Sequence, residues 1–140
     1  MMLSAILALL ALATPPQAQS AAWQGVWRNA ANSVHIRTQA CGRNLCGTVI
    51  WANEKAKADV AARGGRLVGV QLFRDFERGE DGLWYGEVFV PDIGRSFSGT
   101  LEQQDANTLV GEGCLFGRLG CRTQVWTRVR ETAKARPRRR

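Results

Sequence analysis

Apolar and polar residues alternate along most of the chain from residue 25 to residue 129, with the two-residue period of β-strands that bury one face. The clearest example is Ser33–Gln39, in which Val34 and Ile36 alternate with polar side chains. Turn-forming residues separate such segments, as in Pro91-Asp92-Ile93-Gly94, where proline presets φ and glycine accepts a positive φ. The pattern predicts about eight short strands joined in sequence.

One segment breaks this alternation. Residues 53–63 are rich in alanine and in charged side chains, which predicts a short helix with Asn53 near its N-cap and Gly64-Gly65 after its end. The strand pattern resumes in Leu67–Phe73. The helix is therefore expected to be a single excursion from a sheet whose other connections are short turns.

The first and last predicted strands decide how the sheet ends. In a sheet that closes on itself these two strands pair antiparallel, so the start of one lies beside the end of the other. This pairing would place Trp27 near Arg128, with the guanidinium over the indole face. Closure also removes exposed sheet edges. We therefore predict an all-β fold, a small antiparallel up-and-down barrel.

A barrel of about eight strands is wide enough to be filled by its own side chains or to hold one small ligand. The aromatic content favours the filled state, with Trp51, Trp84 and Tyr85 in the core. Glycines inside strands mark bends and close backbone approach, and they could also leave interior volume. These glycines are Gly47, Gly69, Gly86, Gly99, Gly111 and Gly113.

The start of the chain predicts where the protein is located. Leu3–Ala13 is an apolar segment too short to span a bilayer, and the small residues at 18–21 suit a signal peptidase. We interpret residues 1–20 as a signal peptide cleaved near residues 20–22; a buried N-terminal helix is the alternative. The mature protein would then be periplasmic or secreted, with no transmembrane segment and one domain over residues 21–130.

Four cysteines are arranged as two local pairs, Cys41 with Cys46 and Cys114 with Cys121. In an exported chain an even number of cysteines indicates disulfides. Three connectivities are possible, and the two local bridges are favoured because each pair brackets residues that can turn the chain. A four-thiolate zinc site is the rival interpretation, although such sites normally use closer pairs.

The formal net charge is +7, and much of it lies in the last ten residues. Residues 131–140 are predicted to be a disordered basic tail. Such a tail could contact an anionic envelope surface. The lack of interleaved aromatics and the expected export both disfavour nucleic acid as a partner.

The sequence provides little for catalysis. His35 is the only histidine and lies on the polar face of its strand, while Glu87 and Glu112 have the phase of outward-facing residues. We predict no catalytic, cofactor-binding or metal-binding residue. The remaining candidates are Arg63, Arg66 and Arg95 near a barrel mouth, which could receive an anionic ligand or could be solvated loop arginines.

Several segments taken together resemble one bacterial exported family, catalogued as domain-of-unknown-function family 2147, over nearly all of the domain. The resemblance implies a lipocalin-like barrel in which Gly25-Val26-Trp27 and Arg128 form the closure signature, and it implies no activity, substrate or cofactor. The segments that carry it are Gly25-Val26-Trp27, Cys41–Gly47, Arg63, Arg66–Gly69, Pro91–Gly94 with Phe97, Gly113-Cys114, and Cys121–Val129.

Three hypotheses about function follow. The leading one is a non-enzymatic exported barrel that binds a small apolar or amphipathic ligand. The second is a cell-envelope interaction module whose arginine-rich tail contacts anionic surfaces. The third, an enzyme, would require Asp92, His35, Glu87 or Glu112 to meet in one concave site.

Overall fold

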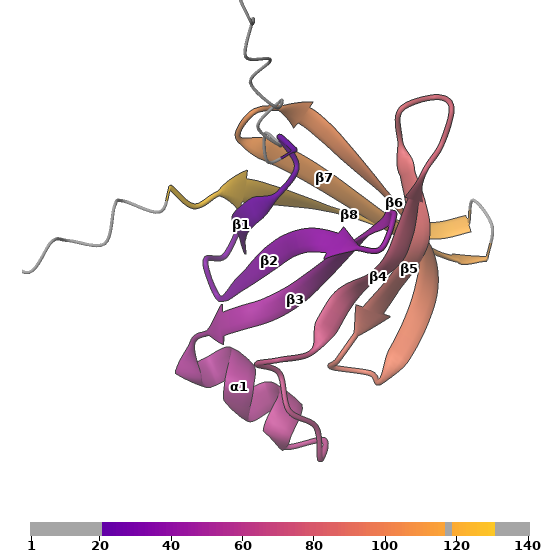
Figure 1. The fold of residues 1–140 in the computed structure, drawn as a ribbon. Helices are drawn as coiled ribbons and strands as arrows, with labels where there is room; N and C mark the ends of the chain where they lie inside the picture. Colours follow the sequence, from indigo (N-terminus) through magenta and orange to yellow (C-terminus); the bar gives the residue numbers. More distant parts are fainter. Residues whose placement is uncertain (1–20, 117–118, 131–140) are drawn as a thin grey trace, which may run out of the picture.

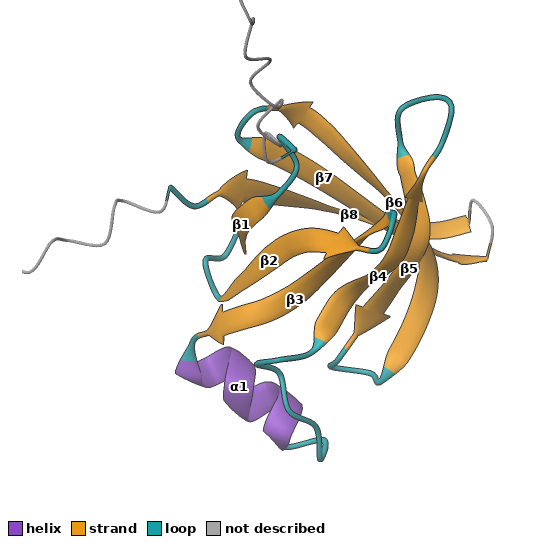
Figure 2. Ribbon diagram, in the orientation of Figure 1, coloured by secondary structure: helices purple, strands orange, loops and turns teal. Residues whose placement is uncertain are grey.

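A computed structural model describes residues 21–116 and 119–130 of the chain. It contains eight strands and one short helix (Figures 1 and 2). In chain order these are β1 (Gly25–Asn29), β2 (Val34–Cys41), β3 (Asn44–Ala52), α1 (Glu54–Ala61), β4 (Gln71–Arg78), β5 (Trp84–Val90), β6 (Arg95–Asp105), β7 (Thr108–Phe116) and β8 (Leu119–Arg128).

Each strand pairs antiparallel with the next, and β1 pairs with β8 to close the barrel. The closing register sets Trp27 opposite Arg128 and Asn29 opposite Trp126. The predicted all-β fold, an up-and-down barrel of eight antiparallel strands with a short helix after the third, is therefore confirmed.

The two ends of the barrel are the helix end and the closure end. The connections β1–β2, β3–β4, β5–β6 and β7–β8 lie at the helix end, because the β3–β4 connection contains α1. The segment before β1, the connections β2–β3, β4–β5 and β6–β7, and the segment after β8 lie at the closure end.

The interior is occupied by the side chains of the barrel itself. A Cβ atom at Gly47 would lie 2.6 Å from the Phe73 ring, and one at Gly86 would lie 2.7 Å from the Phe76 ring. These glycines thus admit aromatic rings rather than a ligand. The buried cluster is Trp27, Ile36, Leu45, Val49, Ala52, Val60, Leu67, Leu72, Phe73, Phe76, Trp84, Leu101, Leu109 and Trp126.

The closure rests on Arg128. Its guanidinium lies 4.3 Å from the centre of the Trp27 ring. It also donates hydrogen bonds to the carbonyls of Gln24 at 2.9 Å, Ala106 at 2.7 Å, and Ala22. One side chain therefore ties the segment before β1 to the end of β8 and to the β6–β7 turn, while it covers the indole.

The helix begins where the sequence predicts. The Asn53 side chain caps it by accepting a hydrogen bond from the Ala56 backbone N–H at 2.8 Å. Val60 is its buried residue and packs into the core cluster. This contact anchors α1, and with it the loop of residues 62–70, to the helix end of the barrel.

The two local cysteine pairs lie within bonding distance of each other, Cys41 with Cys46 and Cys114 with Cys121. Cys41–Cys46 spans the β2–β3 turn at the closure end, and Cys114–Cys121 joins β7 to β8 near the helix end. Each bridge therefore fixes one hairpin.

Three predictions about strands and core are wrong. Leu67–Phe73 is not one strand, because Gly69 has a φ of +93° and β4 begins only at Gln71. The alternation also predicts a turn over Phe116–Gly120, but β7 reaches Phe116 and β8 begins at Leu119.

The third error concerns the aromatic residues. Trp84 is buried, but Trp51 is 43% exposed and Tyr85 is 45% exposed. The Trp51 ring contacts the His35 ring, with 4.5 Å between ring centres and 44° between ring planes, and the Tyr85 hydroxyl donates to the Asp81 carboxylate. Aromatic character alone does not tell the inner face of a strand from the outer one.

The predicted signal peptide, residues 1–20, and the basic tail, residues 131–140, lie outside the described residues. Among the residues that the structure describes, no helix has the length and apolar character needed to cross a membrane.

Candidate functional site

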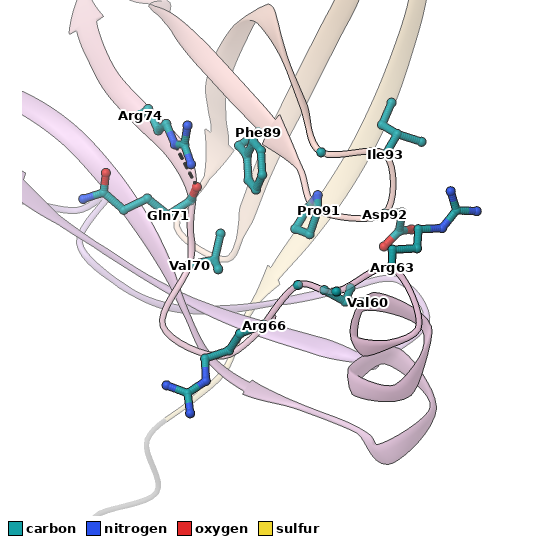
Figure 3. A pocket seen from close by; sticks show the side chains of 13 residues that line it. Val60, Arg63, Arg66, Val70, Gln71, Arg74, Phe89, Pro91, Asp92 and Ile93 are labelled. Carbon is teal, nitrogen blue, oxygen red and sulfur yellow. Dashed lines mark hydrogen bonds between the residues drawn. The ribbon is translucent and has the colours of Figure 1, made fainter.

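A surface cleft of about 620 Å³ lies at the helix end of the barrel (Figure 3). It opens between the loop after α1 and the β5–β6 turn, and strands β4 and β5 form its floor. Its volume falls in the range of small-molecule sites. The lining residues are Val60, Arg63, Gly64, Gly65, Arg66, Val70, Gln71, Arg74, Phe89, Pro91, Asp92, Ile93 and Gly94.

The floor lies on the outer face of the barrel wall. Phe73 and Val88 pair across β4 and β5 and contribute to the core, whereas the neighbouring pair, Arg74 and Glu87, faces the opposite way. Phe89 is two residues from Glu87 and shares its face. The cleft is therefore separate from the filled interior.

Arg74 and Phe89 form the centre of this floor. The Arg74 guanidinium lies 4.2 Å from the centre of the Phe89 ring, and its Nε donates to the Gln71 carbonyl at 3.2 Å (Figure 3). Its Nη1 is 3.9 Å from the Glu87 carboxylate. The Arg74 cation thus lies on an apolar ring, and among residues 21–116 and 119–130 Glu87 is its one counter-charge within 4 Å.

Two of the three predicted arginines line the cleft. Arg63 and Arg66 flank Gly64-Gly65 in the exposed loop after α1. Within the described part of the chain neither makes an ion pair. Figure 3 shows the Arg66 side chain directed away from Phe89. Arg95 is exposed and follows Gly94, but it does not line the cleft.

Sequence reasoning missed Arg74 and Phe89. Their alternation with Phe73 and Val88 marks them as outward-facing, but nothing in the pattern shows that the loop after α1 covers this outer surface. The cleft depends on where that loop lies, and the loop is positioned by the contact of Val60 with the core.

The residues considered for catalysis do not meet. Glu87 lies near Arg74, while the Glu112 carboxylate accepts from Thr123 at 3.4 Å on the wall formed by β7 and β8. His35 is hydrogen-bonded to the Asn32 side-chain oxygen at 2.7 Å. Of the four residues considered, Asp92 alone lines the cleft.

His35 has a lowered pKa, chiefly because of partial burial and secondarily because the Arg28 guanidinium disfavours a second positive charge. Folding therefore shifts the equilibrium of this imidazole, which contacts the Trp51 ring, toward its neutral form. The His35 ring lies at the barrel rim. Among the contacts of the described residues, neither a nucleophile nor a carboxylate reaches this ring.

Glu112, Cys114 and Cys121 place an oxygen and two sulfur atoms within 4.8 Å of one another, which resembles a metal site. The two sulfur atoms are joined to each other in the disulfide. Thiolates are the form in which cysteine binds metals, so this group offers no ligand set while the bridge is intact.

A second hollow, of about 460 Å³, lies beside the closure and is lined by Arg128 together with Gln24, Gly25, Val26, Arg37, Thr38, Gln39, Val129 and Arg130. The Arg128 guanidinium is already committed to three carbonyls and to the Trp27 ring. We attribute this hollow to the packing of β1 against β8 and not to ligand binding. The helix-end cleft is the candidate site.

Residues 25–128 match the family described as "Uncharacterized protein conserved in bacteria (DUF2147)". The chain belongs to this family. The match runs from the first residue of β1 to the last residue of β8, and it includes every residue that lines the helix-end cleft. No curated protein and no solved structure matches the chain. Membership of the family thus defines an uncharacterised bacterial domain and leaves its activity to be argued from the site.

Proposed function

We propose that this protein is a non-enzymatic binding protein that holds a small amphipathic anion in the helix-end cleft. The apolar part of the ligand would lie on the cleft's apolar side chains, and its anionic group would be held by Arg63 and Arg66. The interior of the barrel is not the proposed site, because Phe73 and Phe76 occupy the space that the strand glycines leave.

One observation carries this proposal: a cleft of suitable volume combines apolar side chains with three arginines and a single carboxylate. Arginine forms paired hydrogen bonds with carboxylate, phosphate and sulfonate groups. Arg63 and Arg66 have no competing ion pair within the described residues, so no such pair must be broken when a ligand binds. The apolar contributors are Val60, Val70, Phe89, Pro91 and Ile93.

Export is part of the proposal. Two disulfides support a periplasmic or secreted protein, because such bridges persist in oxidising compartments. A ligand met there would come from the envelope or from the medium. No cofactor and no catalytic group is proposed for the cleft.

The test uses anilinonaphthalene sulfonate, a fluorescent amphipathic anion, with phenylnaphthylamine as its uncharged counterpart. We expect R63A/R66A to weaken binding of the anionic probe about tenfold, equivalent to about 1.4 kcal/mol, and to leave binding of the uncharged probe unchanged. The matched control is R43A, which removes an exposed arginine from the β2–β3 turn at the closure end.

A further variant locates the apolar part of the site. Ile93 lines the cleft and is half exposed, so I93S should weaken both probes without unfolding the barrel. Equal affinities of wild type, R63A/R66A and I93S for the anionic probe would show that the cleft is not the binding site.

A further inference from the structure

The three arginines that line the helix-end cleft lie in two separate parts of it. Arg63 and Arg66 belong to the loop after α1, whereas Arg74 belongs to β4 on the floor. Figure 3 shows Arg74 on one side of the Phe89 ring and Arg63 on the other side. The cleft therefore carries positive charge at two places, one on the loop and one on the floor.

The lining between these two places is apolar. Phe89, Pro91 and Ile93 alternate along the end of β5 and the β5–β6 turn, and all three line the cleft. Figure 3 shows Phe89 and Pro91 between the two cationic places. Phe89 and Pro91 are half-buried, and Ile93 is 51% exposed. A ligand lying along these side chains would bring one of its ends to Arg74 and the other end to the loop after α1.

Arg74 is held in a fixed orientation by its neighbours. Its guanidinium lies 4.2 Å from the centre of the Phe89 ring, and its Nε donates to the Gln71 carbonyl at 3.2 Å. A guanidinium fixed in this way loses little conformational freedom when an anion binds, so the entropic cost of binding is reduced. The two Nη atoms are the donors that such an anion would contact.

Glu87 is a weak partner for Arg74. Its carboxylate lies 3.9 Å from Nη1, which is longer than a hydrogen bond, and both side chains are more than a third exposed. Ion pairs in such surroundings contribute little, because water screens them. Glu87 also lies outside the residues that line the cleft. An anionic group of a ligand would therefore compete with this carboxylate for Arg74 at little cost.

The charges of the lining favour a ligand with two anionic groups. Three arginines and one carboxylate, that of Asp92, give the lining a formal charge of +2. A ligand with a single anionic group at the loop would place its uncharged end against Arg74, and this removes water from a cation without supplying an acceptor. A second anionic group at that end supplies the acceptor and balances the charge.

We infer that the ligand of the cleft is a bipolar dianion, a short apolar body with an anionic group at each end. Arg63 and Arg66 bind one group, and the Nη atoms of Arg74 bind the other. The body lies on Phe89 and Pro91 between them. This inference rests on the proposed function, and it adds the chemical class of the ligand and a specificity-determining residue on the floor of the cleft.

The test compares three naphthalene sulfonates by isothermal titration calorimetry. Naphthalene-2-sulfonate has one anionic group, naphthalene-2,6-disulfonate has one at each end of the ring system, and naphthalene-1,3-disulfonate has both on one ring. We expect the 2,6-disulfonate to bind the wild-type protein about tenfold more tightly than either of the others. The 1,3-disulfonate separates the placement of the two charges from their number.

Two variants test the contact at Arg74. R74A should weaken binding of the 2,6-disulfonate about tenfold and leave binding of naphthalene-2-sulfonate unchanged. E87Q should strengthen binding of the 2,6-disulfonate about twofold, because the carboxylate that competes for Arg74 becomes neutral. The matched control is R78A, which should bind all three probes as the wild type does. Arg78 is an exposed arginine on the same strand and also lies over an aromatic ring, Trp84, but it does not line the cleft.

Circular dichroism should show the same folded barrel in these variants, because the replaced side chains are all partly exposed. The inference is overturned if the three probes bind the wild-type protein equally, or if R74A affects the 2,6-disulfonate no more than R78A does. The proposed function stands in either case as long as R63A/R66A weakens binding of anilinonaphthalene sulfonate. If R63A/R66A binds that probe as the wild type does, the proposed function fails and the inference fails with it.

Discussion

The two ends of the barrel differ in what their arginines and aromatic rings contact. At the closure end, the Arg128 guanidinium is bound to three carbonyls and covers the fully buried Trp27 ring. At the helix end, Arg63 and Arg66 make no ion pair within the described residues, and Trp51 and Phe116 lie open to solvent. The same residue types stabilise the fold at one end and remain available for binding at the other.

This difference between the two ends follows from the order of the strands in the closed sheet. The segments before β1 and after β8 both lie at the closure end, and the hydrogen bonds of Arg128 join these parts of the chain, which are far apart in sequence. Every other strand pair is joined by its own connection and needs no such tie. Groups at the helix end can therefore stay exposed without loss of the fold.

The largest expected effect compares a tryptophan at each end. W27A removes a side chain with 0% exposure and its hydrogen bond to Thr38, so we expect a loss of about 3–5 kcal/mol in the free energy of unfolding. W51A removes a half-exposed ring and should cost about 1 kcal/mol. Urea denaturation measures both values, and similar losses would contradict the division between the two ends.

A smaller effect compares the two disulfides. Replacing Cys41 and Cys46 with serine should lower the free energy of unfolding by about 2 kcal/mol, because this hairpin carries the buried Leu45. Replacing Cys114 and Cys121 should cost less, about 1 kcal/mol or below, because Phe116 and Leu119 beyond this bridge are exposed and contribute little to the core.

Chemical denaturation gives both losses, and hydrogen exchange shows where each one acts. The second replacement should accelerate exchange only near residues 114–121. A loss in the free energy of unfolding equal to that caused by replacing Cys41 and Cys46 would mean that the ends of β7 and β8 unfold together with the rest of the barrel.

The smallest effect concerns His35 at the helix end. Its pKa is below the ordinary 6.5, so the unfolded chain takes up the proton first as the pH falls. The free energy of unfolding should therefore decrease slightly as the pH drops below about 6.5, and then level off below the folded pKa. The effect is small because the ring is partly exposed.

An NMR titration of the single imidazole measures the folded midpoint, and the H35Q variant should lack the decrease in stability that begins below about pH 6.5. A folded midpoint at or above the ordinary value would contradict the stated burial and the influence of Arg28.

Predictions from sequence succeeded where neighbours in the chain decide the outcome. The alternation of Val34 and Ile36 with polar residues predicts β2 and its inner face, and Asn53 predicts the start of α1. Predictions from sequence failed where the outcome depends on the backbone conformation of a glycine or on which face of the sheet a side chain occupies. The positive φ of Gly69 ends an apparent strand, and Trp51 and Tyr85 lie on outer faces that their apolar character does not reveal.

The sequence by itself determined the number of strands, the single helix and the two segments that close the barrel, and it favoured the local cysteine pairs, because period, turn residues and cysteine spacing act over short distances. Only the tertiary structure decided that aromatic rings occupy the space beside Gly47 and Gly86, that the cleft lies outside the wall beneath the loop after α1, and that Arg95 falls outside it. These features depend on which distant side chains share a space, and that is set by register and packing across the closed sheet.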